Sequence, residues 1–382
     1  MRLLSVLIFC IAGLISTGCT VLPTEPSLSH YPEDLISGEL AFGHEIKSAE
    51  ALDLLDLSPQ MERFLIESRS RESKISYVRF KRVMSGLVER GYFKNSYTRD
   101  GTYSASETFA RAQGNCLGYT NMFITLARAV GLPARYQLVE SDPKWDVSNG
   151  LLVRNNHINL ELGEMKTVQG VRSKVIVDFN QTQPEGEVRS QIISDAHAAS
   201  LFSANIGVKR MSARDYEGAF SHLRRAIETY PANRVAWNNL GVLYSRLEKF
   251  HESTSAFETA LAIDPNDKTA WTGLAVVLKS VGQVDEAEAY ARKIRRYRNG
   301  NPYFHYAVAT DAYRSQSYAE ALKAIQSAIS LKKSDARFFT LQASVARVLG
   351  DDVLADKSLR LAKRKFRAQA QSVTASYYSD GP

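Results

Sequence analysis

Residues 111–135 read RAQGNCLGYTNMFITLARAVGLPAR, and the surrounding region can be interpreted outward from them. Apolar residues recur with helical spacing over 117–130, and a Gly-Leu-Pro sequence ends that pattern. The sequence therefore predicts a helix with Cys116 at its N-terminus. The positive end of a helix dipole and its unpaired amides lower the pKa of a cysteine and can stabilise an oxyanion. Cys116 is therefore a candidate nucleophile.

The pattern after this helix changes to the alternation that is typical of strands. It predicts strands at 134–140, 151–162 and 174–179. His157 lies in the second strand, and Asp178 lies near the end of the third. A carboxylate in an apolar strand is costly unless it is paired, and His157 is the available partner. A thiol, a histidine and an aspartate are the residue types of a nucleophile, a general base and an orienting carboxylate.

The segment before the cysteine is predominantly helical. Periodic apolar residues predict helices at 49–57, 60–68 and 75–90. Together with the later strands they predict one α+β domain over residues 46–199.

The residues around Cys116, His157 and Asp178 resemble the transglutaminase-like superfamily, which is related to papain-type thiol enzymes. The resemblance rests on the segments 114–119, 126–135, 157–162 and 177–179. It implies a papain/transglutaminase-like core, without a cofactor or a metal. In that core Cys116 would be the nucleophile, His157 the general base and acid, and Asp178 the residue that orients the histidine. A degenerate, inactive domain is the alternative.

Gln113 lies three residues before the candidate nucleophile. In papain relatives a glutamine supplies a second oxyanion donor, so the resemblance makes Gln113 a possible oxyanion ligand. A solvent-facing loop residue is the other interpretation of Gln113.

The second half of the chain repeats with a period of 34 residues. The block 234–267 places Trp, Leu, Gly, Tyr, Phe, Ala and Pro at positions 4, 7, 8, 11, 24, 27 and 32. This pattern resembles the tetratricopeptide repeat, a helix pair that stacks on its neighbours as an all-α solenoid. Five repeats are predicted at 200–233, 234–267, 268–301, 302–335 and 336–369, followed by a tail at 370–382. The resemblance implies that these repeats bind a protein substrate or partner.

Charge is concentrated in the repeats. Residues 200–382 hold 27 Lys and Arg against 18 Asp and Glu, a net charge of +9, so the remaining residues carry −2 of the total of +7. Solvated helix faces explain such a charge, and so would an acidic partner or an anionic membrane or glycan surface.

The N-terminus has the features of an export signal. A positive residue, an apolar run over 3–15 and small residues precede Cys19. Residues 1–18 resemble a bacterial lipoprotein signal peptide, which implies lipidation of Cys19. Residues 19–45, which contain several prolines and serines, are then expected to form a tether. Ordinary cleavage and a retained segment are the alternatives.

Composition narrows the class of protein. Length (382 residues) and composition (44% hydrophobic, 23% charged) indicate a folded chain of two or three domains rather than a disordered or multi-span membrane protein. Three cysteines exclude a disulfide scaffold and a cysteine-cluster zinc site. Nucleic acid is an unsuitable partner for an exported protein.

Together these features predict a cysteine enzyme of the bacterial cell envelope, lipid-anchored at the outer membrane and facing the periplasm. It would act on amide bonds through a thioester, as a peptidase or amidase, while the repeats bind a protein. An inactive lipid-anchored scaffold and a crosslinking acyltransferase remain as alternatives.

Overall fold

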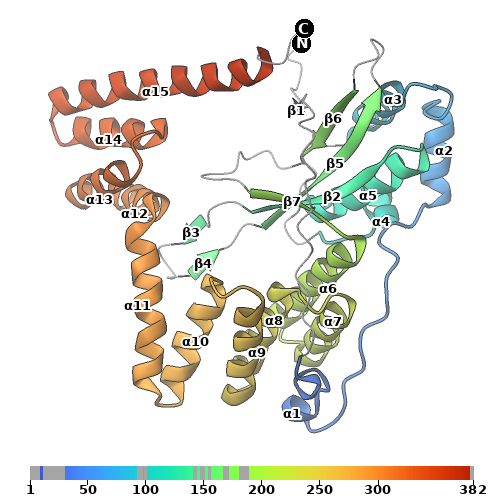
Figure 1. Cartoon of the computed structure of the whole chain (residues 1–382), viewed down its shortest axis with the longest axis horizontal. Coiled ribbons are helices and arrows are strands. Elements are labelled where there is room, and N and C mark those ends of the chain that lie inside the picture. The colour runs from blue at the N-terminus through green and yellow to red at the C-terminus, as the bar shows by residue number, and fades with distance from the viewer. Residues whose placement is uncertain are drawn as a thin grey trace, which may run out of the picture. The chain divides into compact units, whose positions relative to one another are not determined.

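The computed structural model of the chain is drawn in Figure 1. It describes residues 9–11, 31–92, 98, 101–140, 144–146, 151–153, 156–166, 172–179 and 189–378. The chain divides into two compact units. The first comprises residues 1–139, 157–183 and 190–287, and the second comprises residues 140–156, 184–189 and 288–382.

Five short or medium helices lie between residues 39 and 129 of the first unit. They are α1 (Glu39–Phe42), α2 (Pro59–Glu67), α3 (Ser76–Glu89), α4 (Ala105–Arg111) and α5 (Cys116–Ala129), and a 3₁₀ turn, η1 (Glu33–Ile36), precedes them. Helix α5 begins at Cys116, as the apolar pattern predicts. Nearly all of its side chains are buried, because it lies in the centre of the core formed with the strands and with α2 and α3.

The sheet has the strand order β1-β6-β5-β2-β7. Its strands are β1 (Phe9–Ile11), β2 (Ala134–Glu140), β5 (Asn156–Lys166), β6 (Arg172–Val177) and β7 (Arg189–Ile193). Strands β5 and β6 are antiparallel, with Leu160 opposite Val177 and a register shift between Leu162 and Met165. This register brings the start of β5 beside the C-terminal end of β6.

Two predicted elements differ from the structure. The predicted strand 151–162 is divided into β4 (Leu151–Val153), which pairs with β3 (Lys144–Asp146) in a separate ribbon, and β5. Residues 49–57 form no helix, although their spacing is helical. Their backbone is instead held by distant partners: the amide of Ala49 donates to the carbonyl of Ser221, and the carbonyl of Leu54 accepts from the amide of Ala105.

The predicted domain boundary at 199/200 falls inside one helix, α6 (Asp195–Ser212). Its first turns place Ala198, Leu201 and Phe202 in the core of the sheet domain. Its remaining length packs against α7 (Tyr216–Thr229), as the first helix of a pair does. The sheet domain and the first helix pair therefore share a continuous helix instead of a linker.

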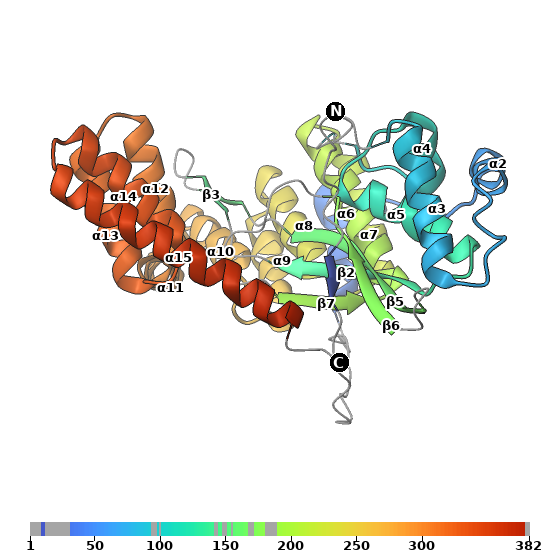
Figure 2. The ribbon, with the colours of Figure 1, turned by 90° about the horizontal axis from the view of Figure 1, so that it is seen from above.

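The later helices follow the 34-residue period. In the first unit they are α8 (Arg234–Arg246), α9 (Phe250–Ile263) and α10 (Lys268–Ser280), and α11 (Val284–Gly300) then runs into the second unit. The second unit continues with α12 (Pro302–Arg314), α13 (Tyr318–Leu331), α14 (Ala336–Val348) and α15 (Asp352–Tyr378). Helices begin at residues 234, 268, 302 and 336, the first residues of the four later repeat blocks. Within the second unit, α12 packs on α13 and α14 packs on α15 (Figure 1, Figure 2).

Two positions of the period set the ends of these helices. The residue before each first helix is Asn or Asp, and its side chain accepts from backbone amides of the next turn at Asn233, Asp267, Asn301 and Asp335. The residue at position 15 has positive φ in every block: Arg214, Glu248, Gly282, Gln316 and Gly350. The caps and the left-handed residue define the two corners of each helix pair.

Part of the predicted tether is folded. Tyr31 contacts the ring of Trp237, Phe42 contacts the ring of Phe220, and the hydroxyl of Tyr244 donates to the carbonyl of Leu35. Residues 31–45 thus pack on α7 and α8 instead of forming an extended linker. Residues 19–30 and Cys19 lie outside the described residues, so lipidation and the tether stay predictions for them. Within the described part of the chain, no helix has the length and apolar character to cross a bilayer.

Candidate active site

Local structure places Cys116 at the start of α5. Helix α4 begins with a capping box between Ser104 and Glu107, and it ends at Ala112, whose φ of 49° turns the chain. Three residues later Asn115 caps α5, because its side-chain oxygen accepts from the amide of Gly118 at 3.0 Å. Cys116 is therefore the first helical residue, half-buried, beside the amides of the first turn.

The loop before α4 packs closely on this helix start. The amide of Asn115 donates to the carbonyl of Gly101, and its side-chain nitrogen donates to the hydroxyl of Thr102 at 2.7 Å. A Cβ at Gly118 would lie 2.9 Å from Oγ1 of Thr108 and 3.3 Å from the carbonyl oxygen of Gly101. Glycine at position 118 is therefore a consequence of this close approach.

His157 lies at the start of β5, directly beside helix α5. Thr120 on α5 donates its hydroxyl to the carbonyl of Ile158 at 3.3 Å, which fastens the strand to the helix. The thiol of Cys116 is hydrogen-bonded to the His157 side chain and accepts from the amides of Ile158 and Leu117. The helix start and the strand start therefore converge on one sulfur atom.

Asp178 follows β6 directly and completes the group. Nε2 of His157 lies 2.5 Å from Oδ1 of Asp178, which leaves Nδ1 of the ring for Cys116. The side chain of His157 is 13% exposed and that of Asp178 is 31% exposed. The structure thus brings together all three residues that the sequence nominated for a triad.

The hydrogen bonds and charges of the site favour the thiolate form of Cys116 and the imidazolium form of His157. Burial raises the pKa of Cys116, but the hydrogen bond and charge of His157, with the amides of Ile158 and Leu117, more than offset this and leave the pKa below its ordinary value. Burial lowers the pKa of His157, but hydrogen bonds and charges from Asp178 and Cys116 outweigh burial and raise it to about 9. Both shifts favour a thiolate beside an imidazolium.

Three aromatic side chains pack together next to this group of residues. Phe179, next to Asp178, packs its ring on Tyr119 and Phe123 of α5. The hydroxyl of Tyr119 donates to the carbonyl of Ala112 at 2.9 Å, at the turn with positive φ. Tyr119 therefore helps to hold the turn before Cys116 in place. Gln113 lies on that turn with an exposed side chain.

Sequence reasoning missed a second contact of Asp178. Nδ2 of the buried Asn159 lies 3.4 Å from Oδ2 of Asp178, so each carboxylate oxygen faces one side chain of β5. Further along that face Glu161 is buried and pairs with Arg135 at 2.6 Å. The contact could have been inferred from the alternation of the polar residues 157, 159 and 161, because this alternation assigns all three to one face of the strand.

The thiol, imidazole and carboxylate groups of this site are suited to a reaction in which an acyl group is transferred to sulfur. Among the described residues no group of three or more His, Cys, Asp or Glu side chains has the arrangement of a metal site. An ionised thiol can attack a carbonyl carbon, and the adjacent imidazolium can return a proton to a leaving group.

Comparison with known proteins identifies two regions. Residues 67–162 match the model of the transglutaminase-like superfamily, and residues 246–310 match a tetratricopeptide repeat model. The first match contains Cys116 and His157, and it ends before Asp178.

Curated relatives match through the repeats. Small glutamine-rich tetratricopeptide repeat-containing protein 2 of Saccharomyces cerevisiae is 28% identical over 129 residues, which are 34% of this chain and 35% of that protein. Tetratricopeptide repeat-containing protein trd-1 of Caenorhabditis elegans is 28% identical over 98 residues, 26% of this chain and 13% of that protein. The chain thus spans about a third or less of the length of these relatives.

Solved structures also match part of this chain. YrrB, described as a tetratricopeptide repeat protein with an unusual peptide-binding site, is 17% identical with a TM-score of 0.25, covering 47% of this chain and 92% of YrrB. A MamA fragment from Desulfovibrio magneticus RS-1 is 15% identical with a TM-score of 0.26, covering 46% of this chain and 98% of the fragment.

Proposed function

For a chain that contains a transglutaminase-like core domain and tetratricopeptide repeats, we propose a cysteine enzyme that hydrolyses amide bonds of a protein or peptide bound by the repeats. The observation that carries the proposal is the hydrogen-bonded row of Cys116, His157 and Asp178, with Cys116 at a helix start. Repeats of this kind mediate contacts between proteins, and the other domain has the architecture of an enzyme.

In the proposed acylation step, the thiolate of Cys116 attacks the amide carbonyl carbon and forms a tetrahedral oxyanion. The carbon–nitrogen bond then breaks as His157 transfers its proton to the leaving amine. A thioester and a neutral imidazole remain. Asp178 keeps the ring oriented and stabilises its charged form throughout.

Deacylation reverses these roles. Neutral His157 takes a proton from water while the water oxygen attacks the thioester carbonyl. The carbon–sulfur bond breaks, the carboxylic acid leaves, and the thiolate and the imidazolium are restored. The sum is hydrolysis of one amide bond by one water molecule. If an amine replaces water, the same steps give crosslinking.

The oxyanion would be stabilised by the start of α5. Amides of a first helical turn are not used by the helix itself, and the amide of Leu117 donates to the sulfur of Cys116. Gln113 is proposed as a second donor, because it lies on the turn that leads into α5. Its exposed side chain has room to reorient toward a bound substrate.

Export, lipidation of Cys19 and an outer-membrane location facing the periplasm remain part of the proposal and rest on the N-terminal sequence alone. The lipid would tether the enzyme to the membrane.

The test combines thiol labelling with substrate turnover. The full chain is treated with iodoacetamide at pH 6 in the presence of glutathione as an ordinary thiol, and alkylation of Cys116 is quantified by peptide mapping. Cys116 is expected to react faster than glutathione. The variant His157→Ala should abolish this difference, whereas His222→Ala on α7 should preserve it.

Turnover separates the candidate functions. With casein as the substrate and dansylcadaverine as an amine, hydrolysis yields new chain ends, and acyl transfer yields fluorescent casein. Cys116→Ala should abolish whichever product forms. An inactive scaffold instead predicts ordinary alkylation of Cys116 and the same casein products, if any, with and without the cysteine.

A further inference from the structure

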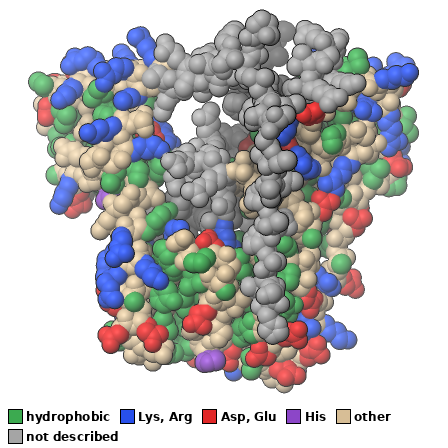
Figure 3. Space-filling model, viewed as in Figure 1, with side chains coloured by type: hydrophobic (Ala, Val, Ile, Leu, Met, Phe, Trp, Pro, Cys, Tyr) green, Lys and Arg blue, Asp and Glu red, His purple; other side chains and the backbone are tan. Residues whose placement is uncertain are grey.

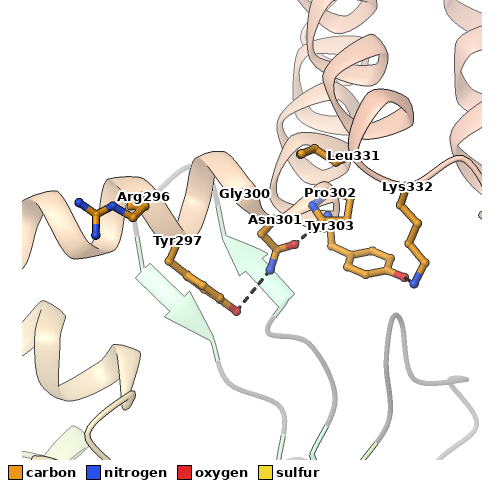
Figure 4. A pocket seen from close by; sticks show the side chains of 8 residues that line it. All are labelled: Arg296, Tyr297, Gly300, Asn301, Pro302, Tyr303, Leu331 and Lys332. Carbon is orange, nitrogen blue, oxygen red and sulfur yellow. Dashed lines mark hydrogen bonds between the residues drawn. The ribbon is translucent and has the colours of Figure 1, made fainter.

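A pocket in the second unit lies apart from the thiol site. It has a volume of about 540 Å³ and lies between the last turn of α11, the corner at 300–302 and the end of α13 (Figure 4). That volume is within the usual range of ligand pockets. The pocket therefore has room for a short piece of another chain.

The charged side chains that line the pocket are both cations. Figure 4 shows Arg296 and Lys332 at opposite ends, with Tyr297 and Tyr303 between them. None of the described residues that line the pocket is Asp or Glu. Lys and Arg side chains also gather over α11 on the face drawn in Figure 3. The two cations among the described lining residues would favour an anion in the pocket.

Lys332 is held in a defined place. Its Nζ donates to the hydroxyl of the buried Tyr303 at 2.8 Å and lies 5.1 Å from the centre of that ring. The guanidinium of Arg337 lies 5.7 Å from the same ring and is paired with Asp335. Tyr303 is thus fixed between two cations, so Lys332 loses little side-chain freedom when it binds an anion.

The corner that forms the middle of the pocket is similarly rigid. The side-chain oxygen of Asn301 accepts from the amide of Tyr303 at 2.8 Å, and its nitrogen lies 3.3 Å from the hydroxyl of Tyr297. Pro302 fixes the first residue of α12. Beside it Leu331 is 46% exposed, which provides an apolar surface inside a basic pocket.

We propose that this pocket binds an extended peptide segment of a partner protein in which acidic side chains flank an apolar one. One carboxylate pairs with Lys332 and another with Arg296, while the apolar side chain packs on Tyr297, Pro302 and Leu331. The inference deepens the protein-binding role proposed for the repeats and rests on it. A membrane surface suits the site less well, because the pocket is concave and has an apolar centre between its two cations.

The experiment uses the full chain and an immobilised peptide array. One set of nonapeptides carries two Glu residues that flank Leu, Ile, Val or Phe at all spacings from one to five residues. The matched set has Gln in place of both Glu residues. We expect capture by the acidic set and roughly tenfold weaker capture by the Gln set, because charge-assisted hydrogen bonds are lost.

Charge reversal locates the binding site. The double variant R296E/K332E should lower the affinity for the best acidic peptide by roughly tenfold or more. The control K323E/K363E makes the same change of net charge at two exposed lysines outside the pocket and should leave the affinity within about twofold. Circular dichroism melting verifies that both variants are folded.

Three results would overturn the proposal: no capture by any acidic peptide, equal capture of the Glu and Gln sets, or equal losses in the two double variants. Phosphatidylglycerol vesicles test the membrane alternative. If R296E/K332E weakens vesicle binding and leaves peptide binding unchanged, the pocket binds an anionic lipid and not a peptide. Alkylation of Cys116 is measured in R296E/K332E as well. If Cys116 still reacts fast while peptide binding is lost, the loss is assigned to the pocket, and if peptide binding is unchanged, the pocket proposal fails while the proposed enzyme stands.

Discussion

At the scale of single residues, the pKa values of Cys116 and His157 depend on two opposing effects. Burial disfavours both charges, and the hydrogen bonds among Cys116, His157 and Asp178 favour both. The second effect is larger for each group, since the pKa of the thiol is lowered and that of the imidazole is raised. The two pKa shifts are therefore produced by the fold and not by either residue alone.

The pKa shifts predict a pH profile. His157 must be protonated to release the amine, so casein hydrolysis should fall as pH rises through about 9. The variant Asp178→Asn keeps an acceptor oxygen and removes the charge that helps to raise the pKa of His157. Its alkaline limb should therefore move to lower pH. Initial rates measured from pH 5 to 10 test this, and an unchanged limb would contradict the assignment of Asp178.

Gly118 gives a second prediction at this scale. In Gly118→Ala the new Cβ meets Oγ1 of Thr108 at 2.9 Å, so we expect a loss of about 1–3 kcal/mol in the free energy of unfolding. Thr108→Ala in the same chain removes that oxygen and should recover part of the loss. Urea unfolding of the two single variants and the double variant measures the coupling, and purely additive losses would exclude this contact as the cause.

At the scale of elements, each helix pair is defined by its corners. Asn and Asp cap the first helices, and a residue with positive φ separates the two helices of each pair. Three of the five positive-φ positions carry a side chain, which raises their backbone energy relative to glycine. The spacing of these corners, rather than sequence identity, keeps the helices in the 34-residue period.

Alanine substitution of the two corner glycines, Gly282 and Gly350, tests the energetic cost of a side chain at a position with positive φ. Nothing lies within 4 Å of a Cβ built on Gly282 or Gly350, so alanine there meets no clash and costs only backbone strain. We expect each change to lower the unfolding free energy by about 1 kcal/mol. Gly300, at the end of α11 and without positive φ, is the matched control and should tolerate alanine without loss. Equal melting shifts for all three variants would refute the argument.

At the scale of the whole molecule, the chain forms two compact units whose limits differ from its sequence domains. Helix α6 belongs to the core of the sheet domain through Phe202 and to the repeats through its pairing with α7. The sheet domain and the early repeats should therefore unfold together, and the late repeats form a separate cooperative unit.

Core truncations distinguish the two units by calorimetry. Phe202→Ala should destabilise the first unit and Phe338→Ala the second, each by about 3–5 kcal/mol, because both rings are fully buried. Each change should shift a different unfolding transition. Val353→Ala, at a side chain that is 81% exposed, should shift neither. A single transition that moves equally with Phe202→Ala and Phe338→Ala would show one cooperative unit.

Local sequence determined much of this protein. Helix α5 and the 34-residue period follow from the spacing of apolar residues, because apolar periodicity reports which face of an element is buried. The nomination of Cys116, His157 and Asp178 rests on their residue types, on their places in the predicted helix and strands, and on the resemblance to the transglutaminase-like superfamily. The helical pattern at 49–57 was misleading, since tertiary hydrogen bonds to Ser221 and Ala105 replaced those of a helix.

Tertiary structure alone decided the relations between distant segments. The contact of Asn159 with Asp178, the double role of α6 and the pocket around Tyr303 join residues that no short-range pattern connects. The direction of the pKa shift of Cys116 was decided there too, because the pKa of a thiol depends on the groups that surround it in space. Sequence therefore determined the elements and their candidate chemistry, and three-dimensional packing determined how those elements share cores, charges and pockets.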